Sequence, residues 1–393
     1  MIVHEILKPE IQNYIDEKTG TDVSKLAFQK NPFPEVDFKI LLNQIEARAK
    51  SKEKLPTWFT TKNIIYPSKI SVEQTSSEIT ARYKSEIVSG DNLIDLSGGF
   101  GVDDFYFSKK MRQLIHCEIN PELSEIVAHN FNQLESHNCS CIAGDSSEII
   151  ENLHQKFDWI YIDPSRRNDS KGKVFMLTDC LPNVPDLQDF YFQYADNILI
   201  KTAPILDITA GLSELKNVKT IHIVAVDNEV KELLWEIEKD FIADIIIKTI
   251  NIKKESTQIF QFHHNTNFVA SLGLPKKYLY EPNSAIMKSG GFTVITTQFP
   301  VEKLHQHSHL YTSNDLIEFP GRVFQIEKVL DYSKKEMREH FSKQNANITT
   351  RNFPDTVETI RTKWNIKDGG DRYCFFTTDK NDSKIVLLCT KIN

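Results

Sequence analysis

The segment Leu-Ile-Asp-Leu-Ser-Gly-Gly-Phe-Gly at residues 93–101 constrains this 393-residue chain most. A short apolar run ends in Asp95, a glycine-rich turn follows, and helix-compatible sequence continues over 102–112. In an α/β sheet, this succession binds a nucleotide-like cofactor at the carboxyl end of the first strand. Glycines let the backbone approach the ligand, and the helix N-terminus offers free N–H groups. A tight turn without a ligand is the alternative for the motif taken alone.

Acidic residues recur at the ends of the next three expected strands. Glu118 ends the second expected strand. Its distance along the sequence from Asp95 is typical of an acid whose carboxylate accepts hydrogen bonds from ribose hydroxyls. Asp145 follows the third strand, and Asp163 follows the fourth. Four consecutive strand ends with an acid favour a cofactor site over an empty turn.

Composition indicates an ordinary globular protein of two or three domains, with 40% hydrophobic and 26% charged residues. The N-terminal residues lack a basic and apolar leader, and no apolar stretch is long enough to span a membrane. The six cysteines form no CxxC pair, which favours reduced thiols over a disulfide framework or a structural zinc site. We therefore expect a cytoplasmic protein with no membrane segment and no structural metal.

Charge is distributed unevenly along the chain. The net charge is −7, yet residues 319–393 carry 14 Lys and Arg against 10 Asp and Glu. A basic tail on an acidic body is typical of a nucleic-acid contact, although a solvated surface is the alternative. The cationic side chains that could reach phosphates there are Lys334, Lys335, Arg338, Arg351, Arg361 and Arg372.

The order of motifs over residues 70–265 resembles class I S-adenosylmethionine (SAM)-dependent methyltransferases. The resemblance implies a Rossmann-like seven-stranded sheet of order 3-2-1-4-5-7-6 with SAM as cofactor. It assigns Glu118 to the ribose and Asp145 to the adenine amino group. Gln74 and Thr75 precede the first strand and are candidates to fold over the cofactor, or else they cap a helix. The residues matching the motif around the methionine moiety are Asp95, Ser97, Gly98, Gly99 and Gly101.

The segment Asp163-Pro164-Ser165-Arg166-Arg167 resembles the start of the catalytic motif of amino-directed methyltransferases, Asp/Asn-Pro-Pro-aromatic. The resemblance makes Asp163, Pro164 and Ser165 catalytic candidates that accept an N–H hydrogen bond and orient the acceptor lone pair. Arg166 and Arg167 replace the usual residues and are candidates to clamp a substrate phosphate. Alternatively, one of them pairs with an aspartate of the loop. The fifth expected strand ends without a cysteine, which disfavours covalent C5 methylation.

The whole chain resembles a narrower bacterial family of class I SAM-dependent methyltransferases with an Asp-Pro-x-Arg-Arg motif and a THUMP-like C-terminal domain. Segments 73–78, 81–84, 163–167 and 367–373 carry this resemblance. THUMP domains bind RNA, so the resemblance implies an RNA partner, with Arg372 among the substrate contacts. The expected parts are a helical N-terminal region (1–70), a SAM-dependent methyltransferase domain (71–265), a small αβ, ferredoxin-like insert (270–317) and a THUMP-like domain (318–393).

Several local elements can be predicted from the pattern. His305, His307 and His309 alternate, which predicts a solvated strand rather than a metal site, since no carboxylate or cysteine is arranged nearby. Within the α/β body we expect helices over 72–89, 190–195, 207–215 and 229–238, strands over 197–202 and 220–226, and an antiparallel hairpin of 244–252 with 258–263. In the C-terminal part we expect strands over 323–329, 373–377 and 385–390, and helices over 334–341 and 356–364.

These features together predict a SAM-dependent methyltransferase acting on tRNA or rRNA by direct methyl transfer to a base nitrogen. A small-molecule or protein methyltransferase is the alternative enzyme. A SAM- or RNA-binding module whose catalytic centre has lapsed is the non-enzymatic alternative, because Ser-Arg-Arg replaces Pro-aromatic.

Overall fold

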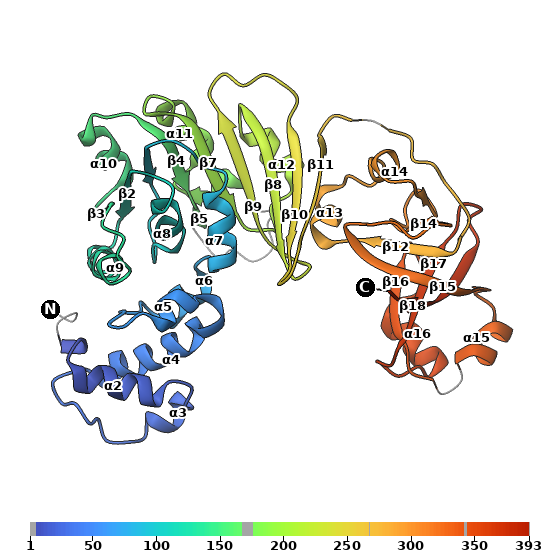
Figure 1. The fold of residues 1–393 in the computed structure, drawn as a ribbon, viewed down its shortest axis with the longest axis horizontal. Coiled ribbons are helices and arrows are strands. Elements are labelled where there is room, and N and C mark those ends of the chain that lie inside the picture. The colour runs from blue at the N-terminus through green and yellow to red at the C-terminus, as the bar shows by residue number, and fades with distance from the viewer. Residues whose placement is uncertain (1–4, 167–175, 267, 342–343, 393) are drawn as a thin grey trace. The chain divides into compact units, whose positions relative to one another are not determined.

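The computed structural model describes residues 5–166, 176–266, 268–341 and 344–392 (Figure 1). The chain divides into two compact units. The first unit runs to Lys219 and adds Lys231–Ala243, and the second comprises Thr220–Val230 and Asp244–Asn393. Within the described residues, no helix combines the length and apolar character needed to cross a bilayer.

The N-terminal region of the first unit is helical, as expected. Asp22 and Asp37 cap helices by accepting hydrogen bonds from backbone N–H groups of the first turn. Trp58 is fully buried against Phe105 and therefore contributes to the hydrophobic core. The helices are α2 (Pro9–Lys18), α3 (Val23–Leu26), α4 (Phe38–Lys54) and α5 (Pro56–Thr60).

The single helix predicted over 72–89 is wrong, because two helices occupy this stretch. Helix α6 (Lys69–Gln74) ends at Thr75, whose backbone is extended. Helix α7 (Glu78–Ser85) begins after Ser77, whose hydroxyl accepts a hydrogen bond from the Thr80 N–H. Hydroxyl side chains at such positions favour caps over a helix interior, which explains the break.

A nine-stranded sheet has the order β3-β2-β1-β4-β7-β9-β8-β10-β11. Its first seven strands, counted along the chain, run 3-2-1-4-5-7-6, which confirms the methyltransferase order. The predicted hairpin is also present, but it adds β10 and β11 beyond the seven strands. The strands are β1 (Asn92–Asp95), β2 (Gln113–Glu118), β3 (Cys139–Ala143), β4 (Phe157–Ile162), β7 (Ala195–Thr202), β8 (Val218–Val226), β9 (Glu229–Glu238), β10 (Ile246–Ile252) and β11 (Thr257–His263).

Two predicted helices of the α/β body are wrong. Residues 229–238 form β9, which pairs antiparallel with β7. Asp227 and Asn228 both have positive φ, as in a two-residue hairpin turn, and therefore lead from β8 directly into a strand. Helix α11 (Val184–Tyr191) ends where the other helix was expected, and Ala195 already belongs to β7.

Helices pack on the nine-stranded sheet, as Figure 1 shows for α9 and α10 beside β2 and β3. The prediction of a helix over 207–215 is confirmed by α12. A short ribbon of β5 (Ser165–Arg166) and β6 (Cys180–Leu181) follows the fourth strand of the sheet. The helices are α8 (Val102–Ser108), α9 (Pro121–Gln133), α10 (Ser146–Leu153) and α12 (Ile208–Glu214).

The second unit contains a seven-stranded sheet of order β13-β14-β12-β15-β18-β17-β16. The predicted C-terminal helices and strands are present, and β16 is additional. Helices of this unit are α13 (Ser284–Ser289), α14 (Ile295–Gln298), α15 (Lys334–Phe341) and α16 (Val357–Trp364). The strands of this seven-stranded sheet are β12 (Tyr278–Pro282), β13 (Glu302–Lys303), β14 (Tyr311–Ser313), β15 (Gly321–Asp331), β16 (Asn347–Arg351), β17 (Arg372–Thr378) and β18 (Lys384–Lys391).

The three alternating histidines lie in the connection between β13 and β14, so the predicted strand is wrong. His305 has a carboxylate neighbour after all, because its Nε2 lies 3.0 Å from Asp382 Oδ1. Its Nδ1 lies 2.9 Å from Asn352 Nδ2. Both ring nitrogens of His305 are thus engaged in side-chain contacts of the fold.

Candidate active site

Asp95 organises the glycine turn after β1. Its buried carboxylate accepts hydrogen bonds from the Ser97 N–H (2.7 Å), the Ser97 hydroxyl (2.6 Å) and the Gly98 N–H (3.2 Å). Gly98 has φ of +57°, and a Cβ there would lie 2.4 Å from the Cys117 carbonyl oxygen. Burial, and secondarily the Asp104 carboxylate, raise the pKa of Asp95. The turn therefore requires glycine at position 98 for both conformation and space.

Glu118 ties the same turn to the end of β2. Its Oε2 accepts a hydrogen bond from the Gly99 N–H (2.8 Å), and its Oε1 accepts one from the Asn120 N–H (2.7 Å). Asp145 caps α10 by accepting hydrogen bonds from two backbone N–H groups. A carboxylate offers about four lone-pair positions, so both acids retain capacity for a ligand.

A cavity of about 600 Å³ lies at the carboxyl ends of these strands. This volume suits a drug-sized ligand or cofactor. Ile119 and Leu181 give it apolar walls, and their side chains are 74% and 53% exposed. Among the residues predicted for the site, those that line the cavity are Ser97, Glu118, Asp145, Asp163 and Ser165.

Other predicted site residues lie elsewhere. Gln74 and Thr75 end α6 and do not line the cavity. Arg372 lies in the second unit, where its guanidinium donates to the His340 carbonyl oxygen and to Gln344 Oε1.

The two arginines of the catalytic motif are only partly described. The backbone of Arg166 pairs with Cys180 in the short ribbon. Arg167 lies outside the described residues. The cavity lining also does not include Asp95, Gly98, Gly99, Gly101 or Pro164.

Asp163 is fixed by two neighbours. Its backbone N–H donates to the Ser97 hydroxyl (2.8 Å), and its Oδ2 accepts a hydrogen bond from Lys201 Nζ. Burial alone would lower the pKa of Lys201, but the neighbouring carboxylates, Asp163 foremost, raise it above its usual value. Lys201 therefore stays an ammonium group beside the candidate catalytic acid.

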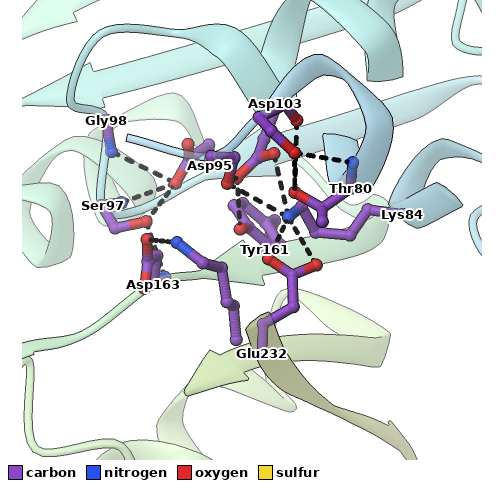
Figure 2. A network of polar contacts seen from close by, with 12 residues as sticks. Thr80, Lys84, Asp95, Ser97, Gly98, Asp103, Tyr161, Asp163 and Glu232 are labelled. Atoms are coloured by element: carbon purple, nitrogen blue, oxygen red, sulfur yellow. Dashed lines mark hydrogen bonds and ion pairs between the residues drawn. The ribbon is translucent and has the colours of Figure 1, made fainter. Parts of the chain in front are cut away.

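A second lysine lies deeper in the same network (Figure 2). Lys84 is fully buried, and its Nζ lies 2.8 Å from both Glu232 oxygens and 3.1 Å from Asp103 Oδ1. The Tyr161 hydroxyl donates to Asp103 Oδ2 at 2.7 Å. Burial favours neutral Asp103, yet Lys84 and Lys201 outweigh it and lower the pKa of Asp103.

Sequence reasoning gave no role to Lys84, Lys201, Asp103 or Glu232. For Lys201 a signal existed, because it is a charged residue at the end of the apolar run 198–200. A charged residue is rarely buried unless paired, so this position predicts a partner. The partner itself could not be identified from the sequence.

A third buried group lies beneath the glycine turn. Asp104 Oδ2 is 2.5 Å from His116 Nδ1, and potential ligand atoms of Asp95, Asp104 and His116 all lie within 4.8 Å of one another. Burial raises the pKa of both carboxyl groups and lowers that of His116. These directions favour neutral groups that share protons, and we assign no metal here.

Comparisons with known proteins agree with this architecture. Residues 278–320 match the family model of a ferredoxin-like domain, and residues 321–391 match that of a THUMP domain-like region. The crystal structure of a candidate methyltransferase from Porphyromonas gingivalis W83 covers 99% of both chains at a TM-score of 0.87 and 29% identity. The fold is that of a class I methyltransferase with ferredoxin-like and THUMP-like C-terminal domains.

A shorter similarity concerns a curated relative. An uncharacterized RNA methyltransferase of Clostridium acetobutylicum is 33% identical over 99 residues, which are 24% of this chain and 22% of the relative. The match therefore spans less than a quarter of that relative's length.

Proposed function

We propose that this chain is a SAM-dependent methyltransferase that acts on RNA. The observation that carries the proposal is the cavity lined by Ser97, Glu118, Asp145 and Asp163, each from a different strand end. Similarity over the full chain to the candidate methyltransferase of P. gingivalis supports it. The described structure has no disulfide among the six cysteines, which is consistent with a cytoplasmic enzyme. The four-part division at residues 1–70, 71–265, 270–317 and 318–393 remains part of this proposal.

Glu118 and Asp145 of the cavity and the adjacent glycine turn have proposed tasks in holding SAM. The glycine turn around Asp95 would hold the methionine moiety, Glu118 the ribose hydroxyls and Asp145 the adenine amino group. Ile119 and Leu181 offer apolar surface to the adenine faces. Gln74 and Thr75 remain candidates to approach the cofactor from α6.

SAM supplies an activated methyl group on a sulfonium, so the protein mainly aligns the acceptor and excludes water. The network beside the cavity contains the carboxyl groups of Asp103, Asp163 and Glu232 and the amino groups of Lys84 and Lys201. The two ammonium groups therefore lie close to three carboxyl groups and offset much of their negative charge.

Replacing Glu118 with Gln is expected to weaken SAM binding by about 1–3 kcal/mol, the scale of hydrogen bonds to a charged group. Calorimetric titration of SAM measures this change. Glu125→Gln is the matched control, because Glu125 is exposed on α9 and does not line the cavity. Equal affinity of the two variants would remove Glu118 from the cofactor site.

The RNA part of the proposal is supported by the THUMP-like match and by the name of the C. acetobutylicum relative. In the second unit, three predicted phosphate contacts already have internal partners: Arg351 pairs with Glu281, Arg361 with Asp368 and Arg372 with Gln344. Lys334, Lys335 and Arg338 are instead exposed together on α15. We propose α15 as a phosphate contact, with Arg166 and Arg167 closer to the reaction.

Changing Lys334, Lys335 and Arg338 together to Gln should weaken tRNA and rRNA binding. Each lost phosphate contact should reduce the slope of log affinity against log salt by about 0.7–0.9. Gel shifts across a salt series measure both effects, while SAM affinity should stay unchanged. A control with the same charge change is Lys25, Lys30 and Lys52 to Gln, all exposed in the N-terminal region. If both triple variants bind RNA equally well, α15 is only a solvated surface.

A further inference from the structure

We propose that the acceptor atom is a hydroxyl oxygen, the ribose 2′-hydroxyl of RNA, rather than a base nitrogen. This inference rests on the proposed function and concerns the same site. The observation behind it is the lysine ammonium group held against the candidate catalytic aspartate.

Strand register places these two groups together. Ile162 of β4 pairs with Ile200 of β7 in a parallel ladder, so the residues that follow, Asp163 and Lys201, emerge side by side. Asp163 lines the cavity, and its side chain is 40% exposed, whereas that of Lys201 is 14% exposed. The ammonium group therefore lies beside the carboxylate that would meet the acceptor.

The deeper lysine, Lys84, fixes two further carboxylates of the same network. Glu232 contacts Lys84 with both oxygens, and Asp103 is held by Lys84 and Tyr161. The negative charges of Asp163, Asp103 and Glu232 raise the pKa of Lys201 and so keep its amino group charged. Lys201 is thus a hydrogen-bond donor and not a base, since an ammonium group has no lone pair.

The number of lone pairs on the acceptor atom distinguishes a hydroxyl oxygen from an amino nitrogen. A hydroxyl oxygen has two lone pairs, so it can accept a hydrogen bond from Lys201 and attack with the other pair. An amino nitrogen has a single lone pair, and a hydrogen bond from an ammonium group would occupy the electrons needed for attack. An ammonium group at this position therefore assists an oxygen acceptor and hinders a nitrogen acceptor.

The lining of the cavity points the same way. A base nitrogen acceptor requires the base to be held in the site, commonly by stacking on aromatic rings. None of the described lining residues is aromatic, and Ser165 stands in the catalytic motif where amino-directed enzymes carry their second proline. A ribose needs no stacking platform at the point of reaction.

The step is a direct displacement. The hydroxyl oxygen forms a bond to the methyl carbon of SAM, the carbon–sulfur bond breaks, and its electron pair returns to sulfur, which leaves as a neutral thioether. The hydroxyl proton moves to the Asp163 oxygen that does not accept from Lys201, and then to water. Lys201 stabilises the negative charge that develops on the acceptor oxygen.

The position of the transferred methyl group tests the inference with the wild-type protein. Total tRNA and rRNA from cells lacking the protein are incubated with methyl-labelled SAM and then hydrolysed in alkali. A 2′-O-methyl group blocks cleavage of the adjacent phosphodiester, so the label should appear in alkali-resistant dinucleotides. Label in mononucleotides would overturn the inference and leave an RNA methyltransferase. No label in any RNA, despite SAM binding, would overturn the proposed function and this inference with it.

Variants of Lys201 test its part in the reaction. Lys201→Met should lower kcat by about 10²-fold or more, as removal of a charge-stabilising donor does, with SAM affinity within about twofold of wild type. Lys201→Arg retains the positive charge and should recover part of the loss. Lys216→Met is the control, because Lys216 is 67% exposed and pairs with Asp189 rather than Asp163. Equal activity of Lys201→Met and Lys216→Met would refute a role for the ammonium group.

Discussion

Replacing Lys84 with Met is expected to destabilise the first unit by about 3–5 kcal/mol, the scale for breaking a buried ion pair by removing one partner. Lys84 has no exposed surface, and its ammonium group faces both Glu232 and Asp103. Met has a similar length but leaves two carboxylates without their buried cation. The loss should therefore far exceed that of a surface ion pair, which is about 0–1 kcal/mol.

Urea unfolding followed by tryptophan fluorescence measures this effect. Of the four tryptophans, only Trp364 lies outside the first unit, so the Trp364→Phe background restricts the signal to that unit. Lys110→Met, at an exposed position, is the control. Adding Glu232→Gln to Lys84→Met should recover part of the lost stability, because one uncompensated charge is removed. A change below about 1 kcal/mol for Lys84→Met would show that the network contributes little.

Asp163→Asn should reduce methyl transfer by about 10²–10⁴-fold, the usual contribution of a positioned acid or base. The amide cannot take up the acceptor proton, and it no longer pairs with the Lys201 ammonium group. SAM affinity should remain within about twofold of wild type, since the glycine turn and Glu118 are unchanged. Single-turnover rates with labelled SAM separate this effect on chemistry from cofactor binding.

The matched control for Asp163→Asn is Asp189→Asn, an exposed aspartate outside the cavity. Normal turnover by the Asp163 variant would exclude it from catalysis. A parallel loss of SAM affinity would instead assign Asp163 to the cofactor.

The parts of the site that could be predicted are those governed by local sequence. A parallel strand ends at one edge of its sheet, so acids that follow successive strands must gather there. Of the four predicted acids, Glu118, Asp145 and Asp163 accordingly line one cavity, whereas Asp95 is buried and hydrogen-bonded to Ser97 of the lining. Their roles toward SAM remain predictions.

The helix predicted over residues 229–238 is wrong because tertiary contacts outweigh the local helix propensity. Residues 229–238 are rich in Glu, Lys and Leu, which favour a helix by intrinsic propensity. Pairing with β7 and burial of Leu233, Leu234 and Trp235 outweigh that small preference. The Asp227–Asn228 turn was the available signal, because two consecutive residues of this kind favour a tight hairpin.

The network of lysines could not be predicted for a different reason. Lys84 and Glu232 are 148 positions apart in the chain, and their contact depends on the placement of α7 and β9. Nothing in either local segment encodes the other. Only the complete fold brings the two lysines and three carboxylates together.

The second sheet has a consequence for how this protein can be divided. The ferredoxin-like match ends at residue 320 and the THUMP-like match begins at residue 321. Yet β12 of the first match pairs with β15 of the second, from Tyr278 with Gln325 to Pro282 with Gly321. Cutting the chain at that boundary would expose two strand edges and invite aggregation. The smallest segment that can be moved to another protein intact is therefore the one that contains the whole sheet. A gene fusion or truncation designed from the two family matches alone would divide that sheet.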